Sequence, residues 1–297
     1  MITLNTSRIL VPFDFSLTSK KALKHAAALA QICKGELQLL YIQKPKSRIS
    51  IGRTTAELRR IAEEAESNKR IIEMTAKEIR EEYNIPVKVL VDIGNKISGI
   101  LSVCEKNKVG LIVMGTEGSD SVSNLFSGSN SHKVVSRSTI PVITVRAETK
   151  REGYANILIP VDLSEHTRQK IVMAIQLAKL FKSRLHLLGI LNKEDKDAEN
   201  KLKAIIKQIE KRLKSDNIEY TSELVVSDTA ASKALVVAKR KKSDMIITMT
   251  DQGPSASLLG PRTFDHELVD ESNIPVLSVP PELHEENIAP ASIAGLW

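Results

Sequence analysis

The chain repeats itself. Residues 8–16 (RILVPFDFS) return as residues 156–164 (NILIPVDLS), and residues 140–145 (IPVITV) return as residues 274–279 (IPVLSV). The first pair is separated by 148 positions and the second by 134, so the second copy is 14 residues shorter. Two matching segments at corresponding places indicate a tandem duplication, and a chain of 297 residues has room for two such domains.

Each copy alternates short apolar runs with segments of helical periodicity. Runs of this kind, rich in Val, Ile and Leu, are typical of strands buried on both faces. We expect strands at 8–13, 36–42, 87–91, 111–114 and 141–145, and again at 156–161, 184–190, 219–226, 244–249 and 274–279. Helices are expected between them. Ser16 or Thr18 can cap the first helix and Gly35 can end it.

Strands and helices that alternate at these lengths predict the α/β class. Each domain should be an open five-stranded parallel sheet with helices on both faces. The expected domains are 1–148 and 149–281, followed by a tail, 282–297. The strands that begin Ile-Pro would be exposed edges, and an apolar edge needs a partner. We therefore expect 140–145 and 274–279 to pair within the chain as an internal pseudo-dimer. The sequence leaves open a further homodimer and a docking role for the tail.

One loop rich in glycine and serine follows the fourth strand. Residues 114–131 read MGTEGSDSVSNLFSGSNS, with glycines at 115, 118 and 128 and Ser129 directly after the last. Glycine lets a main chain approach a ligand closely, and main-chain N–H groups together with hydroxyls can surround phosphate oxygens. In an open α/β sheet this is the edge where ligands bind, and Asp14 at the end of the first strand would face the loop. A Ser-rich surface loop without a ligand is the alternative.

The spacing Gly-x2-Gly-x9-Gly-Ser resembles the nucleotide-binding signature of the universal stress protein family, in its ATP-binding branch. The resemblance covers nearly all of residues 5–280. It implies the adenine nucleotide alpha hydrolase-like fold and a site for ATP, or for AMP or ADP, with or without Mg²⁺ or Mn²⁺. By resemblance, Asp14 and the main chain of Pro12 and Phe13 lie beside the nucleoside, and Ile42 and Val91 line the base pocket. The phosphate residues would be Gly115, Gly118, Gly128, Ser129 and Asn130, with Ser131 assisting, and Met114 is also expected among the binding residues.

Two acidic residues depart from the family pattern. Glu117 and Asp120 lie inside the phosphate loop, where they would repel a triphosphate unless a divalent cation bridges them. Binding would then be weaker, metal-dependent, or directed at a less charged nucleotide such as AMP. Asp14 has a second interpretation as a helix cap or turn residue. His132 could reach a phosphate, but a capping or surface role is the alternative.

The second copy keeps Asp162 but changes the loop. Residues 113–118 (VMGTEG) align with residues 248–253 (TMTDQG), only six residues separate Gly253 from Gly260, and Pro261 takes the place of the following Ser. Proline has no N–H to donate. We expect this domain to have lost normal triphosphate binding, with a vestigial pocket near Asp162 and Arg262 left open.

No catalytic motif is found. The sequence has no Gly-x4-Gly-Lys-Ser/Thr, GxGxxG or HExxH pattern, no general base can be named, and no metal ligand set is predicted. Any ATP hydrolysis should be slow or absent. Cys33 and Cys104 form no CxxC motif and are expected to be buried free thiols.

The amino-acid composition restricts the kinds of partner that the chain is expected to bind. Aromatic residues make up 3% of the chain, which argues against stacking platforms for nucleic acid. The net charge of +7 is uneven, with 23 Lys/Arg against 15 Asp/Glu in residues 1–150. That excess could attract polyanions or belong to solvated helix surfaces. There is no signal peptide pattern and no apolar run of about 20 residues, so we expect a cytoplasmic protein without a membrane anchor.

The leading hypothesis is a tandem universal stress protein that binds ATP or another adenine nucleotide in its first domain and serves as a stress-response or signalling module. The alternatives are an interaction scaffold that binds no nucleotide and a weak ATPase or adenylate-handling enzyme. The stress, the pathway and the protein partners are not encoded in any motif of the chain.

Overall fold

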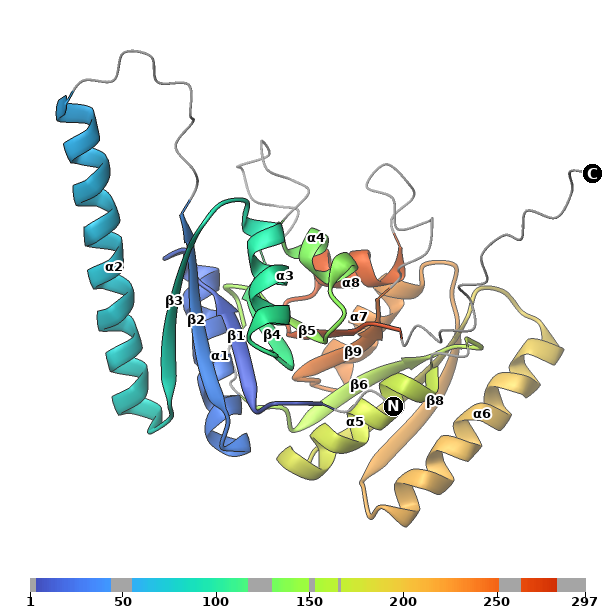
Figure 1. Ribbon diagram of the computed structural model, residues 1–297. Helices are drawn as coiled ribbons and strands as arrows, with labels where there is room; N and C mark the ends of the chain where they lie inside the picture. The colour runs from blue at the N-terminus through green and yellow to red at the C-terminus, as the bar shows by residue number, and fades with distance from the viewer. Residues whose placement is uncertain are drawn as a thin grey trace, which may run out of the picture.

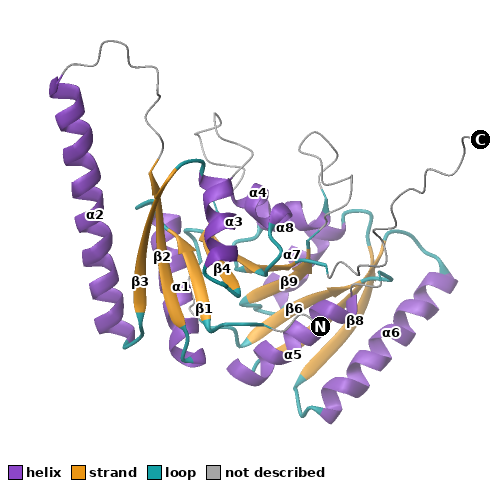
Figure 2. Cartoon of the chain, in the orientation of Figure 1, coloured by secondary structure: helices purple, strands orange, loops and turns teal. Residues whose placement is uncertain are grey.

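The computed structural model describes residues 4–43, 55–116, 130–149, 153–164, 167–250 and 263–281, without the side chains of 55–58, 60–62, 64 and 130. Figure 1 shows the elements along the chain and Figure 2 their type. The first half contains β1 (Arg8–Pro12), α1 (Leu17–Cys33), β2 (Glu36–Gln43), α2 (Thr55–Tyr83), β3 (Val87–Ile93), α3 (Lys96–Lys106), β4 (Leu111–Gly115), α4 (Asn130–Arg137) and β5 (Val142–Val145). The second contains β6 (Asn156–Val161), α5 (Thr167–Phe181), β7 (Arg184–Leu191), α6 (Lys196–Ser215), β8 (Tyr220–Val226), α7 (Ala230–Arg240), β9 (Met245–Met249), α8 (Phe264–Glu271) and β10 (Val276–Val279).

All ten strands form one sheet in the order β3-β2-β1-β4-β5-β10-β9-β6-β7-β8. Neighbouring strands are parallel within each half, and only the central pair of this sheet, β5 and β10, is antiparallel, with Ile143 opposite Leu277. The expected pairing of the two Ile-Pro strands is therefore confirmed, and the two halves form an internal pseudo-dimer. Figure 1 shows α2 and α6 flanking the two ends of this sheet.

The two faces of the sheet have different cores. On one face α1, α2, α5 and α6 cover a single apolar cluster that runs through both halves, including Ile9, Leu39, Ile157 and Leu187. On the other face the cores are separate: α3 and α4 cover Leu10 and its neighbours, and α7 and α8 cover Leu158 and its neighbours. Because successive strand residues point to opposite faces, even-numbered residues of β1 and β2 face α3 and odd-numbered ones face α1.

The ends of α1 show how the sequence sets the local structure. The Ser16 hydroxyl accepts a hydrogen bond from the Ser19 N–H, so Ser16 is the N-cap rather than Thr18. The helix ends at Lys34, which adopts the left-handed conformation with φ of 54°, and not at Gly35 as expected. Gly35 is needed for a different reason: a Cβ there would lie 2.1 Å from the Thr6 carbonyl oxygen.

Both cysteines are free thiols, and Cys104 is buried as expected, whereas Cys33 is only half-buried. Burial raises the pKa of the Cys104 thiol to about 12. Among the residues described, no helix combines the length and apolar character needed to cross a membrane.

Candidate functional site

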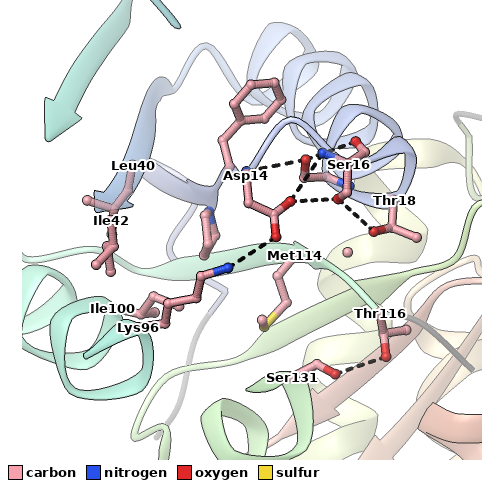
Figure 3. Close-up of a pocket in the computed structure, with 14 residues that line it drawn as sticks. Asp14, Ser16, Thr18, Leu40, Ile42, Lys96, Ile100, Met114, Thr116 and Ser131 are labelled. Atoms are coloured by element: carbon pink, nitrogen blue, oxygen red, sulfur yellow. Dashed lines mark hydrogen bonds and ion pairs between the residues drawn. The ribbon is translucent and has the colours of Figure 1, made fainter. Parts of the chain in front are cut away.

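A cavity of about 180 Å³ opens at the carboxyl ends of β1, β2 and β4 (Figure 3). β1 and β4 are neighbours although they are far apart in sequence, and their helices leave on opposite faces. This is the topological switch point, where ligands bind in open α/β sheets. The cavity brings together seven of the predicted residues: Pro12, Phe13, Asp14, Ile42, Met114, Gly115 and Ser131. It is also lined by Ser16, Thr18, Ser19, Leu40, Lys96, Ile100 and Thr116.

Asp14 is held in place on both carboxylate oxygens. Its Oδ1 accepts hydrogen bonds from the Ser16 hydroxyl at 2.6 Å and the Ser16 N–H at 3.3 Å, and its Oδ2 lies 3.3 Å from the Lys96 Nζ. Burial by itself would raise the pKa of this carboxyl, but the Ser16 hydrogen bonds and the Lys96 charge outweigh it and lower the pKa. Asp14 is therefore a preoriented anion with Oδ2 toward the cavity (Figure 3).

Lys96 was not predicted as a site residue. It is the first residue of α3, directly after Asn95, whose side chain caps the helix by accepting from the Ile97 and Ser98 N–H groups. Its side chain is 31% exposed and crosses from α3 to the carboxylate that follows β1. The sequence signal was an isolated lysine after an N-cap, and nothing local to it indicates a partner 82 residues away.

Thr116 and Ser131 form the opposite polar end of the cavity. Their hydroxyl oxygens lie 2.9 Å apart, and the Thr116 N–H donates to the Val145 carbonyl at 2.9 Å. Gly115 lies against the first turn of α1, where an added Cβ would come within 2.6 Å of the Thr18 carbonyl carbon. The missing side chain at position 115 therefore lets β4 and α1 approach each other beside the cavity.

The remaining predicted residues fall elsewhere. Gly118, Gly128 and Ser129 lie outside the described residues, as do Glu117 and Asp120, and Asn130 is the first residue of α4. Val91 does not line the cavity. It pairs with Tyr41, whose hydroxyl bonds to Asn68 of α2, so its side chain lies on the α2 face and is 49% exposed. A contact between Val91 and a base would have to involve its main chain.

The second half does not reproduce this arrangement. The strand register makes Leu111 of β4 equivalent to Met245 of β9. Thr116 is likewise equivalent to Thr250, because the N–H group of each donates to the carbonyl of the last residue of the adjacent strand. Gly115 therefore corresponds to Met249, one position away from the alignment that the sequence suggested. A methionine side chain occupies the place where the first half needs none.

Asp162 keeps the place of Asp14 but has a different cationic partner. Its Oδ1 accepts from the hydroxyls of Ser164 and Thr167 at 2.5 and 2.7 Å, and its Oδ2 lies 3.5 Å from the Lys170 Nζ. Lys170 is 2% exposed and extends from α5, where the first half has Ala22. Burial lowers the pKa of Lys170 although Asp162 counteracts it, and Lys170, Ser164 and Thr167 lower the pKa of Asp162 against its own burial.

His132 faces the other domain rather than the cavity. Its Nε2 is hydrogen-bonded to Asp270 of α8, and its ring packs edge-on against that of His266. His132 is 8% exposed and contacts α8, so the geometry supports an interface between the two halves and neither a phosphate contact nor a surface position. Within the described parts of the chain, no group of three or more His, Cys, Asp or Glu side chains is arranged to hold a metal ion.

Comparison with known proteins agrees with this fold. The model of the Universal stress protein family matches the chain twice, over residues 5–146 and 153–280. The universal stress protein MJ0577 of Methanocaldococcus jannaschii is 29% identical over 153 residues, which are 47% of this chain and 94% of that protein. YxiE of Bacillus subtilis is 30% identical over 150 residues, 47% of this chain and 99% of that protein.

Among solved structures, a universal stress protein from Archaeoglobus fulgidus aligns with 94% of this chain and 98% of its own, with a TM-score of 0.76 and 18% identity. At that identity the alignment shows the fold, and it covers both halves of the chain. The chain therefore belongs to the universal stress protein family.

Proposed function

We propose that this chain binds an adenine nucleotide, ATP or its mono- or diphosphate, in the cavity of the first domain, and that it acts as a nucleotide-responsive module in stress response or signalling. The observation that carries the proposal is the Asp14 carboxylate, which is oriented by Ser16 at the mouth of an apolar cavity. A carboxylate there can accept hydrogen bonds from ribose hydroxyls.

The rest of the cavity suits the other parts of a nucleotide. Leu40, Ile42 and Ile100 offer apolar surface for a purine, and Thr116 and Ser131 offer hydroxyls toward the start of the glycine loop. A mostly apolar cavity with a few convergent polar groups is the usual form of a small-molecule site. Gly118, Gly128 and Ser129 would complete the phosphate end.

We further propose that the division at 1–148 and 149–281 separates a binding domain from one that does not bind. Two features of the second half support this. Met249 fills the place of Gly115, and Asp162 is engaged by Lys170 from within the fold. Four protein donors bond to the Asp162 carboxylate, against three at Asp14, so Asp162 has less acceptor capacity left for a ribose.

The test is calorimetric titration with ATP, ADP and AMP, each with and without Mg²⁺ or Mn²⁺. The matched variants are Asp14→Ala and Asp162→Ala, which remove the equivalent carboxylate from each half. One binding site per chain that Asp14→Ala weakens by about tenfold or more, and that Asp162→Ala leaves unchanged, supports the proposal. No binding under any condition would leave an interaction scaffold as the function.

Two further experiments address the loop and the chemistry. Small molecules that co-purify with the protein, identified by mass spectrometry, should include an adenine nucleotide, and a Gly118→Val, Gly128→Val variant should lose it. Release of ADP or AMP from ATP under single-turnover conditions would instead favour an enzyme.

A further inference from the structure

The cavity of the first domain has two polar ends on either side of Met114 (Figure 3). One end is the hydroxyl pair of Thr116 and Ser131, at the start and end of the glycine loop. The other is the ion pair of Asp14 and Lys96, beside α3. If the proposed nucleotide lies with its 5′-phosphate toward the loop, its ribose reaches Asp14 and the 2′- and 3′-oxygens are the atoms closest to Lys96.

Lys96 has donors left for such a ligand. Its ammonium group has three N–H donors and, among the described residues, bonds to a single oxygen, Asp14 Oδ2. The side chain is 31% exposed, so the ammonium is neither buried in the fold nor fully solvated. The carboxylate alone is enough to accept hydrogen bonds from ribose hydroxyls, which carry no charge. The lysine ammonium adds a positive charge at the same point, and such a charge suits an anionic group of a ligand.

The second half shows that a lysine can pair with this aspartate from a different direction. There the cation comes from Lys170 in α5, on the opposite face of the sheet, and the position equivalent to Lys96 is Ala230. A cation can therefore pair with the carboxylate from the α5 side of the sheet, away from the cavity. In the first half Ala22 is in that place, and the charge is supplied from the side of the cavity instead.

We propose that Lys96 makes this site selective for adenine nucleotides that carry a phosphate ester on the 2′- or 3′-oxygen of the ribose in addition to the 5′-phosphate. The inference rests on the proposed nucleotide function of the same cavity. The ammonium binds the ribose phosphate, and it also offsets the repulsion between that phosphate and Asp14. In dinucleotide sites the two groups are alternatives: an acidic residue binds the free ribose hydroxyl, or a nearby arginine accommodates the ribose phosphate. Here a carboxylate and a cation lie side by side at the same point of the cavity.

The experiment compares three ligands by calorimetry: 5′-AMP, adenosine 3′,5′-bisphosphate and adenosine 2′,5′-bisphosphate. The wild-type protein should bind one of the two bisphosphates about tenfold more tightly than 5′-AMP, because a charge-assisted hydrogen bond is added. In Lys96→Met that ratio should fall to one or below, since Asp14 then faces the phosphate alone. Lys106→Met is the matched control, because it removes the same charge from the exposed end of α3 and should keep the ratio.

The outcomes separate the two proposals. If the wild-type protein binds 5′-AMP or ATP and prefers neither bisphosphate, the role of Lys96 is overturned and the nucleotide function stands. Equal loss of the preference in Lys96→Met and Lys106→Met would also overturn it, since general electrostatic attraction would then explain the effect. If no adenine ligand binds at all, both proposals fail. Thermal unfolding of each variant verifies that the fold is retained.

Discussion

His132 in α4 and His266 in α8 occupy equivalent positions in the two halves, and their ring centroids lie 5.0 Å apart at an interplanar angle of 72°. The same shift of 134 residues relates β4 to β9 and β5 to β10, so the histidine pair lies on the pseudo-twofold axis of the molecule. Figure 1 shows α4 and α8 side by side near the middle of the sheet.

The hydrogen bond that His132 makes does not follow this symmetry. His132 bonds through Nε2 to Asp270, and the main-chain oxygen of Asp270 accepts from Arg146 at 3.1 Å. The residue of α4 that corresponds to Asp270 is Ser136. His132, which directly follows Ser131 of the cavity, therefore bonds across the axis to a carboxylate at a position where the other half has a serine.

Replacing Asp270 with Ala should destabilise the protein by about 2 kcal/mol, because the largely buried His132 ring loses its acceptor. Urea unfolding at neutral pH measures the effect. Ser136→Ala, at the equivalent position of the other half, is the matched control and should cost less than about 0.5 kcal/mol. Equal effects of the two substitutions would show that the hydrogen bond contributes nothing beyond helix packing.

Gly115→Ala should both destabilise the first domain and weaken nucleotide binding. The added Cβ would meet main-chain atoms, the Thr18 carbonyl carbon at 2.6 Å and the Ser19 nitrogen at 2.8 Å, so the first turn of α1 must move away from β4. Overpacking of this kind costs about 1–3 kcal/mol. Thermal unfolding and ATP titration measure the two effects.

Gly153→Ala is the control for this substitution, since nothing lies within 4 Å of a Cβ added at that position. It should leave both the unfolding temperature and the affinity unchanged. Normal nucleotide affinity in Gly115→Ala would mean that the cavity tolerates a displaced helix.

Much of this architecture follows from the sequence because it depends on local patterns. Runs of Val, Ile and Leu located the strands to within one or two residues, and the repeated Ile-Pro strand predicted the pairing of β5 with β10. The position of Asp14 at the end of β1 placed it at the switch point. These features depend on periodicity and chain order, both of which are visible in one sequence.

Three features could not be read in this way. Lys96 and Lys170 reach their carboxylates through long flexible side chains, so their partners depend on helix packing and not on spacing. The face of Val91 depends on the alternation within β3, where a shift of one residue reverses the side chain. The match of Gly115 with Met249 depends on strand register, and the sequence alignment was wrong by one residue.

Lys170→Met should leave the stability at pH 7 unchanged or raise it by up to about 2 kcal/mol, although it removes half of an ion pair. The buried ammonium is costly, as the lowered pKa of Lys170 indicates, whereas the Asp162 side chain is 54% exposed and stays solvated without its partner. Urea unfolding measures the change. Lys179→Met is the control, because it removes an exposed lysine of α5, the helix that also carries Lys170, and this lysine pairs with Asp216 at the end of α6.

The pH dependence of the unfolding free energy provides a second test of this prediction. Because the folded protein holds the Lys170 proton less tightly than the unfolded chain does, wild-type stability should rise with pH between the lowered pKa and the ordinary value of 10.5. That rise should be absent in Lys170→Met. A loss of more than about 2 kcal/mol at pH 7 would contradict the prediction and show that the pair is net stabilising.

Acid should destabilise the protein through His25. This residue of α1 is 3% exposed and packs against Tyr154 at the start of the second half, with its Nδ1 3.4 Å from the Tyr154 hydroxyl. Burial, assisted by the charge of Lys21, lowers the pKa of His25 from 6.5 to about 4. Between these two values the unfolded chain binds a proton that the folded protein does not, so stability falls as the pH falls through that window.

The loss attributable to His25 should reach about 3 kcal/mol by pH 4, since each unit of pKa shift corresponds to about 1.4 kcal/mol. Urea unfolding from pH 7.5 to 4 should show a gap between wild type and His25→Gln that closes as the pH falls, because glutamine does not titrate. Lys21→Met should narrow the window by raising the pKa of His25. If wild type and His25→Gln lose stability in parallel over this range, the acid sensitivity belongs to other groups and His25 is protonated in the folded protein.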